Sequence, residues 1–470
     1  MNIRANCIKW LVFAVVSAAF LWAKKFGLHY TASGDENAYF YMAKLMAEGK
    51  LFYRDFFFAH PPLQLCLLSA IYILFGFNFV LLKLTAALPA LLGGALLYHQ
   101  LWRRGDRLGG IFFIIIFLFN YELLKISTHP FGLNLTVLFI MISVYFFLED
   151  RAFPCGLFWG LAAVTGLYAL PWGLIPALFY LFDEARWRNW GGFAGGFLLI
   201  FGTVNLIFVL IFREQYTTPV YLYHFLKPRG RELVADVFIQ VIKRNFLLFF
   251  LPFLYVWSPK SRPASAVLAA AVVYLLFLTA LNPLFTQYFM LPLPFLAWIG
   301  AKSLSLCIRK FSSPLARAGQ LVVCLLIATG FTADGWSLGG ALDNLQRYVV
   351  HERGTDFRNL RACSDFILEN SAPGDLLFGH VTTVPLLALL TGRDIALDVV
   401  DTNHMRFKSG VADLEKTLDR LSEEIRLKFF IIQESRFWLD QRVQGYLKRC
   451  SPVAVFEEPR ERILIYDCRK

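Results

Sequence analysis

SGDENAYFYMAKLMAEGKLFYRDFFFAHPPL, residues 33–63, is the only long interval rich in polar side chains in the first part of a very apolar sequence. An acidic pair, Asp35 and Glu36, stands near its start, and a basic and aromatic half closes with His60 and two prolines. An interval that gathers acids, imidazoles and aromatic rings between apolar segments is typical of a loop at a membrane surface. The rest of the chain is organised around it.

The first half of this interval predicts a short helix. Ser33 followed three residues later by Glu36 is a capping-box pattern, and Gly49 is a typical residue for the end of a helix. Asp35 would then lie in the first turn, where free N–H groups and the helix dipole favour an ionised carboxylate. Capping alone would explain Glu36, whereas the groups described below favour a functional role for Asp35.

The composition indicates an integral membrane protein. Of the 470 residues, 57% are hydrophobic and 17% are aromatic, which is outside the range of soluble domains. The formal net charge of +12 indicates loops that meet anionic lipid head groups. We expect membrane lipids as partners and no nucleic acid, because no nucleic-acid-binding motif is present. The eight cysteines show no metal-ligand spacing.

The amino-terminal segments define the first external loop. Residues 7–26 end in Lys24 and Lys25 instead of a cleavage site, so we interpret them as an uncleaved signal anchor with a cytoplasmic amino end. Residues 63–77 are shorter than the roughly 20 residues that a spanning helix needs, and we place them at the outer interface. The first external loop is therefore residues 27–78, with juxtamembrane helices.

Ten further segments are interpreted as crossings, which makes about 11 transmembrane helices with the anchor. They are residues 79–102, 109–124, 131–148, 153–168, 169–182, 191–212, 246–257, 264–281, 286–301 and 318–332. We expect a mainly α, polytopic protein of a bacterial inner (plasma) membrane, with its carboxyl end outside. Some outer loops carry positive charge against the positive-inside rule, Lys227 and Arg229 among them. Either the count is off by one crossing, or these residues are kept for an anionic ligand.

The last part of the chain, residues 345–470, has a mixed and charged composition that predicts a soluble extracytoplasmic α/β domain. Five short apolar runs alternate with helical stretches, which favours helices packed on a mostly parallel sheet. The strands are expected at 376–380, 395–400, 429–433, 453–457 and 463–466, and the helices near 356–369, 384–390, 411–428 and 436–448. No glycine-rich phosphate loop opens a helix, so no nucleotide site is predicted. In an oxidising compartment Cys450 and Cys468 could form a disulfide.

On this topology, acids, imidazoles, cations and tyrosines gather at the outer ends of several spans. Each has a local explanation by itself, but together they describe a cavity at the membrane boundary. They are Asp35, Glu36, Arg54, His60, His129, Tyr221, His224, Lys227, Gln287 and Tyr288.

The motifs of the first external loop carry a resemblance to a known group. They are Asp35-Glu36-x-x-Tyr39, Tyr53-Arg54-Asp55 and His60-Pro61-Pro62-Leu63, with Gln287-Tyr288 and Pro294 later in the chain. This order resembles GT-C glycosyltransferases of the protein O-mannosyltransferase and aminoarabinose–lipid A transferase type, glycosyltransferase family 39. The resemblance covers about residues 1–335, which would form the transmembrane catalytic module.

The resemblance implies that a sugar moves from a polyprenyl-phosphate-linked donor to an acceptor on a glycan, a lipid or a protein outside the membrane, with inversion. Asp35 is then the expected base or metal ligand, and Glu36 its support. The expected donor-phosphate and substrate contacts are Tyr39, Tyr53, Arg54, His60, His129, His224, Lys227, Arg229 and Tyr288. No cofactor is certain. A divalent metal, Mg²⁺ or Mn²⁺, would be ligated by Asp35, although the next outer loop offers only Glu122 as a second acid.

Two other classes of protein stay open. A lipid or glycan transporter or flippase would place ionisable groups near the centres of its spans, where this sequence has almost none. A noncatalytic envelope-assembly protein would depend on the external domain and not on Asp35.

Overall fold

The computed structural model describes residues 3–29, 34–182, 185–228, 230, 233–257, 261–281, 283–310, 359–433, 440–457 and 462–469. The chain forms two compact units, each built from three separate segments of sequence. Unit 1 consists of Met1–Leu28, Lys83–Asn205 and Arg229–His351. Unit 2 consists of His29–Leu82, Leu206–Pro228 and Glu352–Lys470, so the first loop and the last domain belong to one unit. The predicted boundary near residues 335–345 lies outside the described residues.

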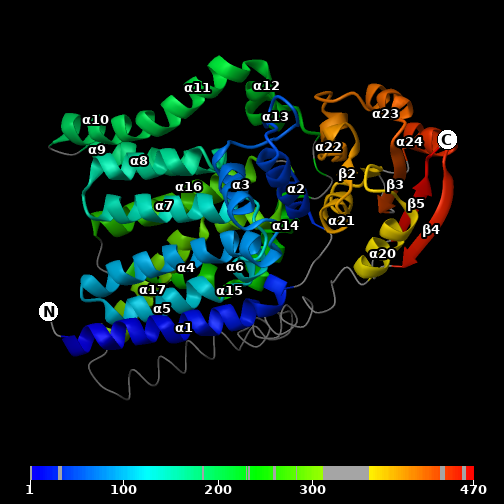
Figure 1. The fold of residues 1–470 in the computed structure, drawn as a ribbon. Coiled ribbons are helices and arrows are strands. Elements are labelled where there is room, and N and C mark those ends of the chain that lie inside the picture. Colours follow the sequence, from blue (N-terminus) through cyan, green and yellow to red (C-terminus); the bar gives the residue numbers. More distant parts are fainter. Residues whose placement is uncertain are drawn as a thin grey trace. The chain divides into compact units, whose positions relative to one another are not determined.

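Unit 1 is helical. Among its helices, α7 packs against α8, α8 against α10, and α17 against α5 and α16 (Figure 1). Its elements are α1 (Ile3–His29), α4 (Phe79–Arg103), α5 (Arg107–Leu118), α6 (Tyr121–Ile126), α7 (Leu133–Leu148), α8 (Ala152–Ala163), η1 (Leu167–Ala169), α9 (Leu170–Leu181), α10 (Arg186–Phe197), η2 (Leu198–Gly202), α14 (Val234–Arg244), α15 (Phe246–Phe250), η4 (Leu251–Trp257), α16 (Arg262–Thr279), η5 (Thr286–Met290) and α17 (Leu293–Lys310).

Glycines allow the closest helix pair of unit 1. A Cβ atom at Gly156 of α8 would lie 1.9 Å from the carbonyl oxygen of Phe193 in α10, and one at Gly196 would lie 2.3 Å from that of Phe153. Small residues at such a crossing let two backbones approach, which is how helices associate in lipid. Packing of this kind explains why the 12-residue helix α8 is stable although it is short.

Four helices in the described part of the chain are long and apolar enough to cross a membrane. They are Asn6–Lys25, Phe79–Arg103, Arg186–Phe212 and Arg262–Thr279, and the bent pair Val234–Arg244 and Phe246–Val256 makes a fifth if it is one span. Several predicted crossings appear as shorter apolar helices, such as α5, α7 and α8. The predicted crossing 286–301 begins instead with the 3-10 helix η5, and α17 starts only at Leu293. The crossing at 318–332 lies outside the described residues, and the count of 11 stays a prediction.

Unit 2 joins short helices to a five-stranded sheet (Figure 1). Helix α2 packs against α3 and against α21. The helical elements are α2 (Glu36–Ala47), α3 (Leu63–Phe75), α11 (Thr203–Phe212, which begins in unit 1), α12 (Glu214–Thr217), η3 (Thr218–Leu222), α13 (Tyr223–Leu226), α20 (Leu360–Asn370), α21 (Val384–Thr391), η7 (Ala396–Asp398), α22 (His404–Lys408), α23 (Leu414–Glu423) and α24 (Gln441–Leu447). The strands are β1 (Leu376–Gly379), β2 (Asp394–Ile395), β3 (Leu427–Gln433), β4 (Ser451–Glu457) and β5 (Arg462–Asp467).

The sheet is mixed, in the order β2-β1-β3-β5-β4, and the expectation of a mostly parallel sheet was wrong. Strand β1 pairs parallel with β2 and β3, whereas β5 pairs antiparallel with β3 and β4. The reason is the short connection between Glu457 and Arg462, since a parallel pair needs a crossover of a dozen or more residues. Strand β3 lies in the middle and is buried along most of its length, as its apolar sequence predicts.

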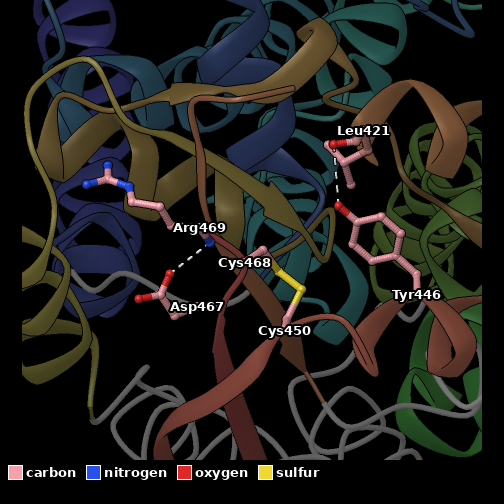
Figure 2. Close-up of a disulfide and its surroundings, with 6 residues drawn as sticks. All are labelled: Leu421, Tyr446, Cys450, Asp467, Cys468 and Arg469. Atoms are coloured by element: carbon pink, nitrogen blue, oxygen red, sulfur yellow. Dashed lines mark hydrogen bonds between the residues drawn. A yellow bond between two sulfur atoms is a disulfide. The ribbon is translucent and has the colours of Figure 1, made fainter. Parts of the chain in front are cut away.

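A disulfide joins Cys450, just before β4, to Cys468, just after β5, as the sequence allowed (Figure 2). Figure 2 also shows the hydroxyl of Tyr446 donating to the carbonyl of Leu421, which ties α24 to α23. The disulfide therefore closes the open end of the antiparallel pair at the edge of the sheet.

Candidate functional site

The acidic start of α2 is held by the loop that follows β1. The backbone N–H of Gly34 and the side-chain amide of Asn37 both donate to the carbonyl oxygen of Thr382, at 3.3 and 2.9 Å. Asp35 is the N-cap residue, without a side-chain capping hydrogen bond, so the helix begins two residues later than the capping box at Ser33 predicts. The predicted cap Ser33 lies outside the described residues, and Gly49, with φ of +90°, follows the end of α2 as expected.

The two acids of this pair differ in exposure. The Asp35 side chain is exposed, whereas only 1% of Glu36 is exposed. The Glu36 carboxylate covers Gly34, where an added Cβ atom would lie 2.2 Å from Oε2. A glycine at position 34 therefore leaves the room that a buried carboxylate needs, and Asp35 is the acid that solvent or a substrate can reach.

Tyr53 fixes the backbone at the other end of the loop. Its backbone has a φ of +68°, a value that is uncommon for residues other than glycine. Its hydroxyl donates to the carbonyl oxygen of His60 at 2.6 Å, and its buried ring packs against Phe208 and Tyr216. Tyr53 thus positions His60 through the main chain.

Two histidines and a lysine lie together in unit 2. The ring centroids of His60 and His224 lie 5.8 Å apart, and the Tyr39 hydroxyl lies 3.2 Å from Nε2 of His60. His224 donates from Nε2 to the carbonyl oxygen of Ala59 at 2.8 Å, which makes Nδ1 its acceptor nitrogen. Lys227 donates to that Nδ1 at 3.4 Å. His224 and Ala59 are 165 positions apart in the sequence, and the fold brings them together.

Charge at this group is concentrated on Lys227. Burial and the neighbouring Lys227 lower the pKa of His224 to about 4, although its bond to the Ala59 carbonyl opposes the shift. Burial, followed by His224 and Lys227, lowers the pKa of His60 well below its usual value, so both imidazoles are neutral at pH 7. Burial also lowers the pKa of Lys227, while the carboxylates of Asp401 and Asp35 act in the opposite direction. Asp35 and Lys227 are therefore within electrostatic reach of each other.

Other predicted residues lie outside this group. Arg54 is exposed and forms a two-point ion pair with its neighbour Asp55, at 2.9 Å for each contact. His129 and Tyr288 belong to unit 1, where the ring of His129 stacks on Phe131 and the Tyr288 hydroxyl bonds that of Tyr168 at 2.9 Å. Arg229 lies outside the described residues.

Sequence reasoning missed the contribution of the last domain. Thr382 follows β1 and Asp401 follows β2, so both lie at the carboxyl edge of the parallel strands, where ligands of α/β sheets commonly bind. Thr382 holds the start of α2, and Asp401 acts on Lys227. Their positions after predicted strands were the only signal, and nothing in the sequence linked them to the first loop.

The residues around Asp35 do not fit a divalent metal ion. Within the described ranges, no three histidine, cysteine, aspartate or glutamate side chains converge in a metal-binding arrangement. The ammonium group of Lys227, on which Asp35 acts electrostatically, would repel a cation.

No known family model and no curated protein matches the sequence. Solved structures do match. ArnT from Cupriavidus metallidurans in the apo state has a TM-score of 0.72 at 16% identity, with 98% of each chain covered. The same protein bound to undecaprenyl phosphate has a TM-score of 0.70 at 13% identity, again with 98% of each chain covered.

The chain has a GT-C fold. The oligosaccharyltransferase of Archaeoglobus fulgidus, in complex with Zn and sulfate, matches at a TM-score of 0.55 and 12% identity, over 97% of this chain and 72% of the other. At these identities the likeness is one of fold. The match to ArnT nevertheless covers almost the entire chain, so the GT-C architecture here includes the last domain as well as the helical part.

Proposed function

We propose that the protein is a membrane glycosyltransferase that moves a sugar from a polyprenyl-phosphate-linked donor to an acceptor hydroxyl or phosphate on the extracytoplasmic face, with inversion. The observation that carries this proposal is the pairing of an exposed carboxylate, Asp35, with a cation and two neutral imidazoles in one compact unit. The GT-C fold supports it, because the structurally similar ArnT has been seen bound to undecaprenyl phosphate.

Each group has a task in such a transfer. The acceptor oxygen attacks the anomeric carbon and loses its proton, which Asp35 accepts as general base. The bond between the anomeric carbon and the phosphate oxygen breaks, and its electron pair leaves with the polyprenyl phosphate. Lys227 would stabilise the charge that develops on this phosphate, and the neutral imidazole of His60 could donate one N–H. His224 gives its own N–H to the Ala59 carbonyl and positions Lys227 through Nδ1. Attack opposite the leaving group inverts the anomeric centre.

Three other residues, Glu36, Tyr39 and Tyr53, hold Asp35 and His60 in position. Buried Glu36 underlies the loop that presents Asp35, and the Tyr39 hydroxyl orients the imidazole of His60. Tyr53 holds the backbone of His60. These contacts fix the geometry of the donor side before substrate arrives, which reduces the free energy needed to order it.

The Cys450–Cys468 disulfide supports an extracytoplasmic place for unit 2, because disulfides form and persist in oxidising compartments. A donor with a long prenyl chain would enter from the outer leaflet of the inner membrane. The acceptor would be a glycan, a lipid or a protein at that face.

The test is an Asp35→Asn variant of the full chain, assayed for sugar transfer and for binding of undecaprenyl phosphate. The amide has almost the shape of the carboxylate but is a far weaker base, so transfer should fall by about 10²- to 10⁴-fold while lipid binding stays within a factor of about three. Asp55→Asn is the matched control, since Asp55 is an acid of the same loop that pairs with its neighbour Arg54 and accepts from the N–H of Leu51. Unchanged turnover of the Asp35 variant would remove this residue from the mechanism.

A further inference from the structure

The segment from Asp401 to Arg406 joins the last domain to the histidine and lysine group. It follows β2 and η7 at the carboxyl edge of the parallel strands and leads into α22. The side chain of Asn403 caps this helix by accepting from the N–H of Met405 at 3.0 Å. The guanidinium of Arg406 donates from Nη1 to the carbonyl oxygen of Asp401 at 2.7 Å, which folds the segment back on itself.

Arg406 and Lys227 each lie over an aromatic ring, and the two rings contact each other. Its guanidinium is 4.4 Å from the centre of the Phe57 ring, and Phe57 meets Tyr223 edge to face at 5.4 Å. The ammonium of Lys227 lies 4.6 Å from the centre of the Tyr223 ring. Two cations from distant parts of the sequence therefore rest on two adjoining aromatic rings.

Asp401 is the counter-ion that these two cations share. Its carboxylate favours the charged form of Lys227 and also that of Arg406. The Asp35 carboxylate acts on Lys227 in the same direction, so the two cations lie near two carboxylates. An anion would be bound here through the hydrogen-bond donors of Arg406 and Lys227.

Arg406 has hydrogen-bonding capacity to spare. Its Nε atom is buried and has no hydrogen-bond partner among the described residues. A buried N–H without an acceptor is unfavourable, and a ligand oxygen at this position would satisfy it. The planar guanidinium presents its donors in a fork that matches a phosphate group.

We propose that Arg406 of the last domain binds the donor phosphate together with Lys227, and that Asp401 holds the two cations in place before the donor arrives. This inference rests on the proposed function, because it names a further contact to the same lipid phosphate. It makes the last domain a part of the substrate site. Before the donor binds, the Asp401 carboxylate acts as the counter-ion of Arg406 and Lys227, and the donor phosphate takes over this role on binding.

The test measures binding of undecaprenyl phosphate and of undecaprenol to the full chain in lipid nanodiscs, without any turnover. Arg406→Ala should weaken binding of the phosphate at least about tenfold, the effect of losing one charged hydrogen bond, and should leave the alcohol unchanged. Arg406→Lys keeps the charge without the fork and should lie in between. Arg442→Ala is the matched control, because Arg442 is also an arginine of the last domain and is paired with Asp440 at the surface.

Each outcome separates the two levels of inference. If Arg406→Ala binds both lipids as the unmodified protein does, while Lys227→Ala loses the phosphate, Arg406 is not a phosphate ligand and the proposed function stands. If Arg406→Ala loses both lipids equally, the residue only supports the fold through Phe57, and the inference is wrong. If the unmodified protein prefers neither lipid, the proposed function fails as well.

Discussion

Removal of the Lys227 charge is the sharpest test of the site. In the group of Lys227, His60 and His224, both imidazoles are neutral at pH 7, so the lysine is the group that can supply positive charge. Lys227→Met keeps an apolar stem of similar length but leaves the carboxylates of Asp35 and Asp401 without this cation. Loss of a charged hydrogen bond to phosphate is worth about 1.5–3 kcal/mol, which corresponds to a Kd for undecaprenyl phosphate about 10- to 150-fold higher.

The assay is equilibrium binding in nanodiscs over a range of salt concentrations. Lys50→Met is the matched control, because it removes the same charge from the same unit, where Lys50 forms an ion pair with Asp398 at 2.6 Å. We expect the control to bind undecaprenyl phosphate normally at every salt concentration. A loss of less than threefold for the Lys227 variant, or an equal loss for the Lys50 variant, would refute the assignment of Lys227 to the phosphate.

Two further predictions concern pH and the sheet. Burial lowers the pKa of Lys227 from 10.5, and phosphate binding needs its charged form, so affinity for undecaprenyl phosphate should fall as the pH rises through that lowered pKa. Lys227→Arg stays charged and should abolish this fall. A fall that persists in the arginine variant would contradict the assignment of Lys227 to the phosphate. Gly379→Ala should lower the free energy of unfolding of unit 2 by about 3 kcal/mol or more, because φ is +144° and the new Cβ would lie 1.8 Å from the Ile431 carbonyl oxygen. Gly374→Ala, at a position with open space around it, should change the free energy of unfolding by less than about 0.5 kcal/mol. Equal midpoints of thermal unfolding for the two variants would show that strands β1 and β3 can separate at Gly379.

Local patterns in the sequence predicted where helices and strands lie better than they predicted how the strands pair. The helix at the start of the first loop and the strand at 376–379 follow from composition and spacing near each residue. The antiparallel half of the sheet did not, because alternation of strands and helices says nothing of how the last two strands pair. The disulfide between Cys450 and Cys468 was allowed by the sequence, and the structure establishes the pairing.

The same limit applies to the site. His60, His224 and Lys227 were identified one by one as polar residues at the ends of spans. Only the fold shows that the ring of His60 lies beside that of His224, and that His224 accepts a hydrogen bond from Lys227. Arg54 has the right chemistry for a phosphate, yet Asp55 beside it in the sequence already binds its guanidinium. Asp401 carried no motif, because its role depends on a lysine that lies far away in the sequence.

Unit 2 has a consequence for the order in which the protein becomes active during translation. The loop with Asp35 leaves the ribosome among the first segments, whereas Thr382, whose carbonyl anchors that loop, follows more than 300 residues later in the chain. Membrane insertion of the helices between them must therefore precede assembly of the site. A nascent chain halted before the last domain would expose its acidic loop without the hydrogen bonds that Gly34 and Asn37 make to the Thr382 carbonyl.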